Sequence, residues 1–132
     1  MGSRLLLIDD EEDILAALGE YFSLLDYKVD TAATGEAARS LMAAHAYDII
    51  ISDLRLDGVR DHTGLELLRE ARASQTEVKT ILLTAYGRPV LALDAMRIGV
   101  DAVVHKPVDL SKLAGMVANL LSQTSAPLGH PC

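Results

Sequence analysis

The run Ile49-Ile50-Ile51-Ser52-Asp53-Leu54 decides the fold of this chain. A short β-branched apolar segment bounded by loop signals is typical of a strand that is buried on both faces, as in a parallel sheet. We therefore predict a central strand over residues 48–52, with Asp53 at the point where its carboxyl end opens. Ligands of open α/β sheets bind outside the carboxyl ends of the strands. Asp53 is therefore the first candidate site residue.

Three other apolar runs also end in polar groups. The candidate side chains that they deliver are Asp9 and Asp10 after residues 4–8, Thr84 at the end of residues 80–84, and Lys106 after residues 102–104. If these runs are parallel strands of one sheet, their carboxyl ends meet at a single edge. We therefore expect acids, a hydroxyl and a lysine to gather there.

Between the strands, apolar residues recur at helical spacing. The expected elements are helices over residues 11–25, from capping Thr34 through Met42, over 64–73, 89–98 and 109–121, with a further strand over 28–32. The inward stripes include Leu25 in the first helix and Ala37 in the second. This alternation predicts an α/β fold whose parallel sheet is covered on both faces.

Length and composition limit the class of protein. The chain has 132 residues, half of them apolar, which suits one domain with a single core. Its formal charge of −7 argues against a basic face for nucleic acid, and its one cysteine excludes an internal disulfide. No apolar run has the length of a membrane span. We expect a soluble cytoplasmic protein with a domain over 4–122 and a flexible tail or truncated linker over 123–132; residues 1–3 are interpreted as a remnant of expression.

The acids imply a specific chemistry. If Asp9, Asp10 and Asp53 meet, their charges repel, so either one carboxyl takes up a proton or a hard cation lies among them. Carboxylates are ligands that Mg²⁺ prefers, usually beside a phosphate. Beside a metal, Asp53 could attack phosphorus as a nucleophile. Lys106 and the Thr84 hydroxyl are suited to bind the phosphoryl oxygens.

Four motifs then carry a resemblance. They are LLLIDDEEDI, IIISDL, LLTAYG and VVHKPVD, in this order along the chain. With them the chain resembles, from residue 4 to about 122, the receiver domains of bacterial two-component response regulators. The resemblance implies a flavodoxin-like (βα)5 fold, doubly wound around a five-stranded parallel sheet of order 2-1-3-4-5.

The resemblance also implies a role for each site residue. The implied Mg²⁺ ligands are the carboxylates of Asp9, Asp10 and Asp53 and the backbone carbonyl of Arg55. Asp53 would accept a phosphoryl group from a phosphohistidine, Thr84 would be the switch hydroxyl, and Lys106 would contact the phosphate. The domain would act as a signalling switch, not a metabolic enzyme, and would catalyse its own phosphorylation and slow dephosphorylation.

The implied partners follow from the same resemblance. The phosphoryl donor would be a sensor histidine kinase or a phosphotransfer protein. An output domain, often a DNA-binding one, is an expected C-terminal neighbour outside this chain. The face formed by the fourth helix, fifth strand and fifth helix, here roughly residues 90–121, is where the family usually contacts partners or forms dimers. No direct contact with nucleic acid or membrane is expected.

The sequence departs from the family pattern in three places. The segment 54–63 is about three residues longer than usual and lacks the usual proline. Val103 occupies the position where a Tyr or Phe commonly couples to the threonine, and Val108 follows Lys-Pro where Phe is common. The positions that tune dephosphorylation in the family correspond to Arg55 and Tyr86. Without an aromatic ring at Val103, the usual coupling of the threonine to such a ring cannot operate here.

Other interpretations compete with this one. The pair Asp9-Asp10 could do no more than cap a helix, and Lys106 could be a solvated charge without a role in a site. A receiver-like interaction module that works without phosphorylation is an alternative function, weakly favoured by Val103. A phosphatase of the dehalogenase type would need an aspartate in place of Arg55, and no glycine-rich phosphate loop follows the first strand.

Overall fold

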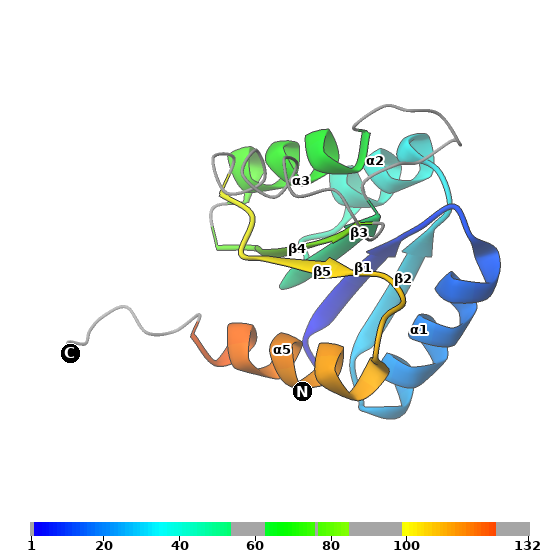
Figure 1. Cartoon of the computed structure of the whole chain (residues 1–132). Helices are drawn as coiled ribbons and strands as arrows, with labels where there is room; N and C mark the ends of the chain where they lie inside the picture. The colour runs from blue at the N-terminus through cyan, green and yellow to red at the C-terminus, as the bar shows by residue number, and fades with distance from the viewer. Residues whose placement is uncertain (1, 54–62, 76, 85–98, 124–132) are drawn as a thin grey trace.

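The computed structural model describes residues 2–53, 63–75, 77–84 and 99–123 (Figure 1). These residues contain a five-stranded parallel sheet of order β2-β1-β3-β4-β5. The strands are β1 (Arg4–Ile8), β2 (Lys28–Ala32), β3 (Ile49–Asp53), β4 (Lys79–Thr84) and β5 (Ala102–His105). The described helices are α1 (Glu12–Leu24), α2 (Gly35–Ala44), α3 (Thr63–Ser74) and α5 (Leu110–Ser122). The predicted fold class and strand order are confirmed.

Helices cover both faces of the sheet. In Figure 1, α2 and α3 lie over one face, and α1 and α5 lie over the other. Successive strand residues point to opposite faces, so Ile50 packs in the cluster under α2 and α3 while Ile49 and Ile51 pack under α1 and α5. Because both faces are covered, every residue of β3 is buried. This explains why the run is apolar without alternation.

The element bounds match the sequence prediction closely, with a few corrections. The central strand is Ile49–Asp53, one residue later than predicted, although the Asp48 N–H donates to the carbonyl of Arg4 at 2.9 Å and its carbonyl accepts the N–H of Lys79 at 3.0 Å. The capping residue is as expected, since Thr34 Oγ1 accepts from Ala37 N at 3.0 Å. The predicted helix over 89–98, most of segment 54–63 and the tail beyond residue 123 lie outside the described residues.

Two inward positions were predicted wrongly. Leu25 is 45% exposed, because α1 ends at Leu24 and the chain turns at Asp26 with φ of 74° toward β2. In α2 the buried side is formed by Gly35 and Ala38, which leaves Ala37 exposed. Within the described ranges, every helix is too short or too polar to cross a membrane.

Polar side chains fix the edge of the sheet where the strands begin, which we call the amino edge. Asp101, just before β5, accepts hydrogen bonds at one oxygen, Oδ2, from Thr80 N (2.8 Å), Thr80 Oγ1 (3.2 Å) and Arg72 Nη1 (3.1 Å). The buried Tyr47, before β3, donates its hydroxyl to Asp30 Oδ2 at 2.7 Å. These bonds tie α3 and β4 to the start of β5, and the middle of β2 to the start of β3.

Candidate functional site

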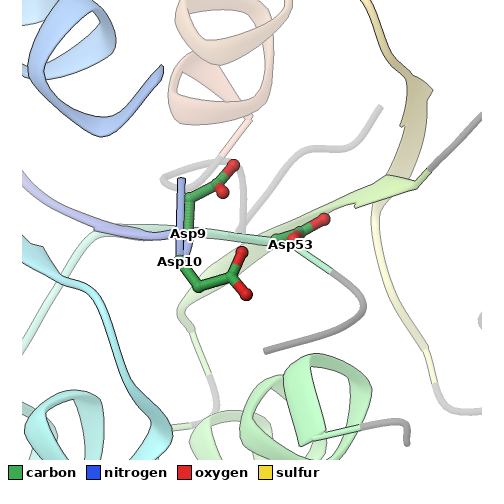
Figure 2. Close-up of side chains that lie close together, drawn as sticks. All are labelled: Asp9, Asp10 and Asp53. Carbon is green, nitrogen blue, oxygen red and sulfur yellow. The ribbon is translucent and has the colours of Figure 1, made fainter. Parts of the chain in front are cut away.

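Three acids converge at the opposite edge of the sheet, the carboxyl edge. Figure 2 shows Asp9 and Asp10 at the end of β1 with their side chains close to Asp53 at the end of β3. Each acid offers one carboxylate oxygen to a group whose members all lie within 4.8 Å of one another. The expected convergence of the acids is therefore observed.

The local backbone explains how Asp9 is positioned. Its N–H donates to the carbonyl of Ala32 at 3.1 Å, which extends the pairing of β1 with β2 by one residue. Its carboxylate Oδ1 accepts the N–H of Glu11 at 2.9 Å, immediately before α1 begins. Asp9 is therefore held between a strand end and a helix start, and it is 1% exposed.

Asp53 is positioned by a glycine that the sequence analysis missed. Gly64, in the first turn of α3, lies so close to β3 that a Cβ there would overlap the backbone carbonyl oxygen of Asp53. It would also lie 2.9 Å from Ser52 Oγ. Only glycine permits this approach of helix and strand. The sequence signal was a glycine directly before the apolar stripe of α3.

Lys106 reaches the acids from the end of β5. Its Nζ lies 3.0 Å from Asp9 Oδ2, 3.4 Å from Asp53 Oδ1 and 3.1 Å from Glu11 Oε1. The lysine therefore belongs to the site, as expected. Glu11 was not expected there, and its only signal in the sequence was that it continues the acidic run Asp9-Asp10.

Of the two remaining predicted site residues, Thr84 lies within the described residues and Arg55 lies outside them. Thr84 is 1% exposed at the end of β4, and its backbone carbonyl accepts the N–H of Lys106 at 2.9 Å. Thr84 therefore lies at the carboxyl edge and fixes the start of the segment that carries Lys106. Arg55 lies outside the described residues, as does Tyr86.

One carboxylate oxygen of the site is buried without a hydrogen bond. Among the described residues, Asp9 Oδ2 is the buried side-chain oxygen that accepts no hydrogen bond of good geometry. Its partner is the ammonium of Lys106, whose Nζ lies 3.0 Å away in an ion pair. The lysine charge compensates the burial of this oxygen, and an oxygen that accepts no hydrogen bond retains the capacity to bind a further ligand. Three carboxylates with such an oxygen fit a hard cation such as Mg²⁺.

Burial and charge shift the pKa values of the central pair. Burial, and then the negative charge of Asp9, raise the pKa of Asp53 from 3.8 to about 6, although Lys106 opposes the shift. Burial also lowers the pKa of Lys106, but the carboxylates of Asp9, Asp53 and Glu11 outweigh it and raise the value above the usual one. At neutral pH the lysine is thus protonated and Asp53 is largely ionised, as a nucleophile must be.

The two valines that depart from the family pattern lie on opposite sides of the sheet. Val103, in β5, is partly buried against the apolar cluster under α2 and α3. Val108, after Lys106-Pro107, packs against the cluster under α1 and α5. Each position is thus filled by a small apolar side chain in contact with the core, where the resemblance led to the expectation of an aromatic ring.

Comparison with known families assigns the chain to a family. The family model described as the response regulator receiver domain matches residues 5–118. The chain belongs to this family. It is therefore a receiver domain of two-component response regulators, and the motifs that carried the resemblance fall within the matched residues.

Individual relatives of this receiver domain agree. The regulatory protein AtoC of Escherichia coli (strain K12) is 32% identical over 123 residues, which are 93% of this chain but only 26% of AtoC. The CheY-like receiver domain protein of Methanospirillum hungatei JF-1 superposes with a TM-score of 0.86 at 24% identity over 94% of this chain and 97% of its own, which shows the fold. The BeF3-activated DrrB receiver domain has a TM-score of 0.81 at 28% identity, with 92% and 99% of the two chains covered.

Proposed function

We propose that this receiver domain accepts a phosphoryl group on Asp53 from the phosphohistidine of a sensor histidine kinase or phosphotransfer protein, with Mg²⁺ bound. The observation that carries the proposal is the buried Asp53 carboxylate 3.4 Å from the Lys106 ammonium and beside two further acids. This set combines a nucleophile, a cation for phosphoryl oxygens and ligands for a metal.

The transfer would proceed by attack of one Asp53 carboxylate oxygen on phosphorus. An O–P bond forms, the P–N bond of the phosphohistidine breaks, and its electron pair returns to the imidazole nitrogen. Lys106 attracts the phosphoryl oxygens, and the Thr84 hydroxyl is the expected second partner at this edge. Attack of water on the acyl phosphate later returns Asp53 to a carboxylate and releases inorganic phosphate.

Asp9 and Asp10 would hold the metal together with Asp53. When bound, Mg²⁺ supplies positive charge to the phosphoryl group and to the acids that otherwise repel one another. The buried Oδ2 of Asp9, which accepts no hydrogen bond within the described part of the chain, supports this role. The backbone carbonyl of Arg55 is the fourth ligand that the family implies.

Phosphorylation would then act as a switch, and not as a step in metabolism. The modification adds negative charge at the carboxyl edge and biases a two-state rearrangement of a partner-binding face, expected roughly at residues 90–121. Because the chain spans only 26% of AtoC, a C-terminal output domain, often DNA-binding, is part of the proposal, as is a dimer through that face. The cytoplasmic location expected from the sequence also belongs to it.

The first test is intact-mass spectrometry after incubation with acetyl phosphate and Mg²⁺. Wild type should gain one phosphoryl group, and Asp53→Asn or a chelator should abolish the gain. Asp48→Asn, which alters an exposed carboxylate at the amino edge, is the matched control and should still be labelled. A gain that survives in Asp53→Asn would place the phosphate elsewhere and contradict the proposal.

A second candidate is a receiver module that works without phosphate. Val103 favours it, because no aromatic ring stands at that position to couple the threonine to the surface. Absence of labelling in well-folded wild type, from both acetyl phosphate and a phosphorylated kinase, would favour this candidate. Partner binding that is equal for wild type and Asp53→Asn would favour it independently.

A further inference from the structure

The ammonium of Lys106 is shared among three carboxylates, and one of them has no part in the proposed chemistry. Asp9 and Asp53 belong to the metal and phosphoryl site. Glu11 lies at a similar distance, since its Oε1 is 3.1 Å from Nζ and accepts a hydrogen bond from it. The Glu11 side chain is 58% exposed, whereas that of Lys106 is only 18% exposed. Glu11 therefore approaches the lysine from the solvent side of the site.

The position of Glu11 in the fold makes this contact specific. Glu11 is the N-cap of α1, where Ser, Thr, Asp or Asn commonly accepts an N–H of the first turn. Its side chain makes no such capping bond and instead contacts a lysine 95 positions further along the chain. Its backbone N–H is held by Asp9 Oδ1 at 2.9 Å. Glu11 is thus fixed by one site residue and directed at another.

We propose that Glu11 is a positioning residue that holds Lys106 before phosphorylation and competes with the phosphoryl group for its ammonium. The inference rests on the proposed function. A phosphoryl group on Asp53 needs Lys106 to turn its N–H donors toward phosphoryl oxygens. The Glu11 contact must then be exchanged, and the Glu11 carboxylate is left near a second anion. Glu11 thereby weakens the hold of the site on phosphate-like anions.

The charges indicate the size of the effect. Lys106 contacts the carboxylates of Asp9, Glu11 and Asp53, and Asp10 lies beside two of these acids, so the metal-free site holds four carboxylates and one ammonium. Because Glu11 is more than half exposed, its ion pair is screened by water. Removing it should therefore tighten anion binding by about two- to fivefold at low salt. The gain should shrink as ionic strength rises.

Glu12 is a control that distinguishes the direct contact of Glu11 with Lys106 from the long-range effect of any negative charge near the site. Glu12, the first residue of α1, carries the same charge one position away, and within the described residues it makes no ion pair with Lys106. Glu12→Gln therefore removes an equal charge without freeing the lysine. Glu11→Asp provides the converse, since it keeps the charge but shortens the side chain, and aspartate at an N-cap turns back to the helix.

The test is the affinity for beryllofluoride at saturating Mg²⁺, measured by calorimetric titration of the full chain at low and high salt. Glu11→Gln and Glu11→Asp should both bind about two- to fivefold more tightly than wild type at low salt, and the difference should fade at high salt. Glu12→Gln should bind as wild type does. A merely structural role for Glu11 would not produce this dependence on salt.

The outcomes distinguish the inference from the function on which it rests. Binding to wild type that is lost in Asp53→Asn supports the proposed function; if Glu11→Gln then matches wild type, the inference is wrong. Equal tightening in Glu11→Gln and Glu12→Gln would also overturn it, because a general field would be sufficient. Wild type that binds no beryllofluoride overturns the proposed function and the inference with it.

Discussion

The two edges of the sheet both carry acids, and their partners differ. At the amino edge, Oδ2 of Asp101 accepts three hydrogen bonds, from Thr80 N, Thr80 Oγ1 and Arg72. At the carboxyl edge, Oδ2 of Asp9 is buried and has one ion pair but no hydrogen bond within the described residues. A satisfied carboxylate fixes structure, whereas an unsatisfied one retains capacity for a ligand.

The acid at the amino edge is expected to increase the free energy of unfolding, whereas Asp53 at the carboxyl edge is expected to decrease it. Buried groups with raised or lowered pKa values and incomplete partners gather at functional sites. At the carboxyl edge the pKa of Asp53 is raised by burial and by Asp9. We therefore expect substitutions of acids at the two edges to change the free energy of unfolding in opposite directions in metal-free protein.

The largest effect is expected at the amino edge. Asp101→Ala should lower the free energy of unfolding by about 3 kcal/mol, because it leaves the N–H of the buried Thr80 without an acceptor and frees Arg72. Urea denaturation measures the change. Glu77→Ala is the control: this exposed acid makes no hydrogen bond or ion pair in the described part of the chain, and its loss should have little effect.

The opposite sign is expected at the carboxyl edge. Asp53→Asn should raise the free energy of unfolding of metal-free protein at pH 7 by about 2 kcal/mol, because it removes a charge that burial disfavours. Chemical denaturation with a chelator present measures the difference. Adding Mg²⁺ should stabilise wild type more than the variant. A destabilised variant would mean that the ion pair with Lys106 outweighs burial.

The pH dependence sharpens the same point. The folded-state pKa of Asp53 is about 6 and its usual value is 3.8, so between these values the folded protein binds more protons than the unfolded one. The contribution of Asp53 to the free energy of unfolding is therefore most favourable below pH 3.8 and decreases as pH rises from 3.8 to about 6. The variant Asp53→Asn should lack this fall. Asp13→Asn, an exposed acid in the first turn of α1, should keep it.

The smallest effect is expected for a single hydrogen bond at the amino edge. Tyr47→Phe removes the hydroxyl that donates to Asp30 Oδ2 at 2.7 Å and should lower the free energy of unfolding by about 1 kcal/mol. Thermal denaturation measures it. Tyr21→Phe is matched, since the Tyr21 hydroxyl makes no hydrogen bond within the described residues. An equal decrease in the free energy of unfolding in the two variants would mean that the hydrogen bond to Asp30 is not the cause.

The sheet could be predicted from local pattern, because a strand covered on both faces, such as Ile49–Asp53, is buried throughout and begins with three consecutive apolar residues without alternation. Asp53 and Lys106 could be predicted because Asp53 is the last residue of one strand and Lys106 directly follows another that ends at the same edge. Leu25 was predicted wrongly, since periodicity continues through it while the backbone turns at Asp26. Helix periodicity records side-chain type and gives no information on where the backbone leaves the helix.

The contact of Glu11 with Lys106 could not be predicted in the same way. It joins side chains 95 positions apart and depends on the direction each takes from its backbone. An N-cap glutamate could equally have faced its own helix or the solvent. The close approach of Gly64 to Asp53 also depends on how α3 packs, which neither residue encodes alone.

The contact between Gly64 and Asp53 has a consequence for insertions. The chain departs from β3 at Asp53 and is back against the carbonyl of the same residue at Gly64, so the two ends of the intervening segment already meet. The closure entropy of a loop grows only with the logarithm of its length, and about three extra residues add only about 0.3 kcal/mol. The length of this segment can therefore vary without displacing the residue that we propose is phosphorylated.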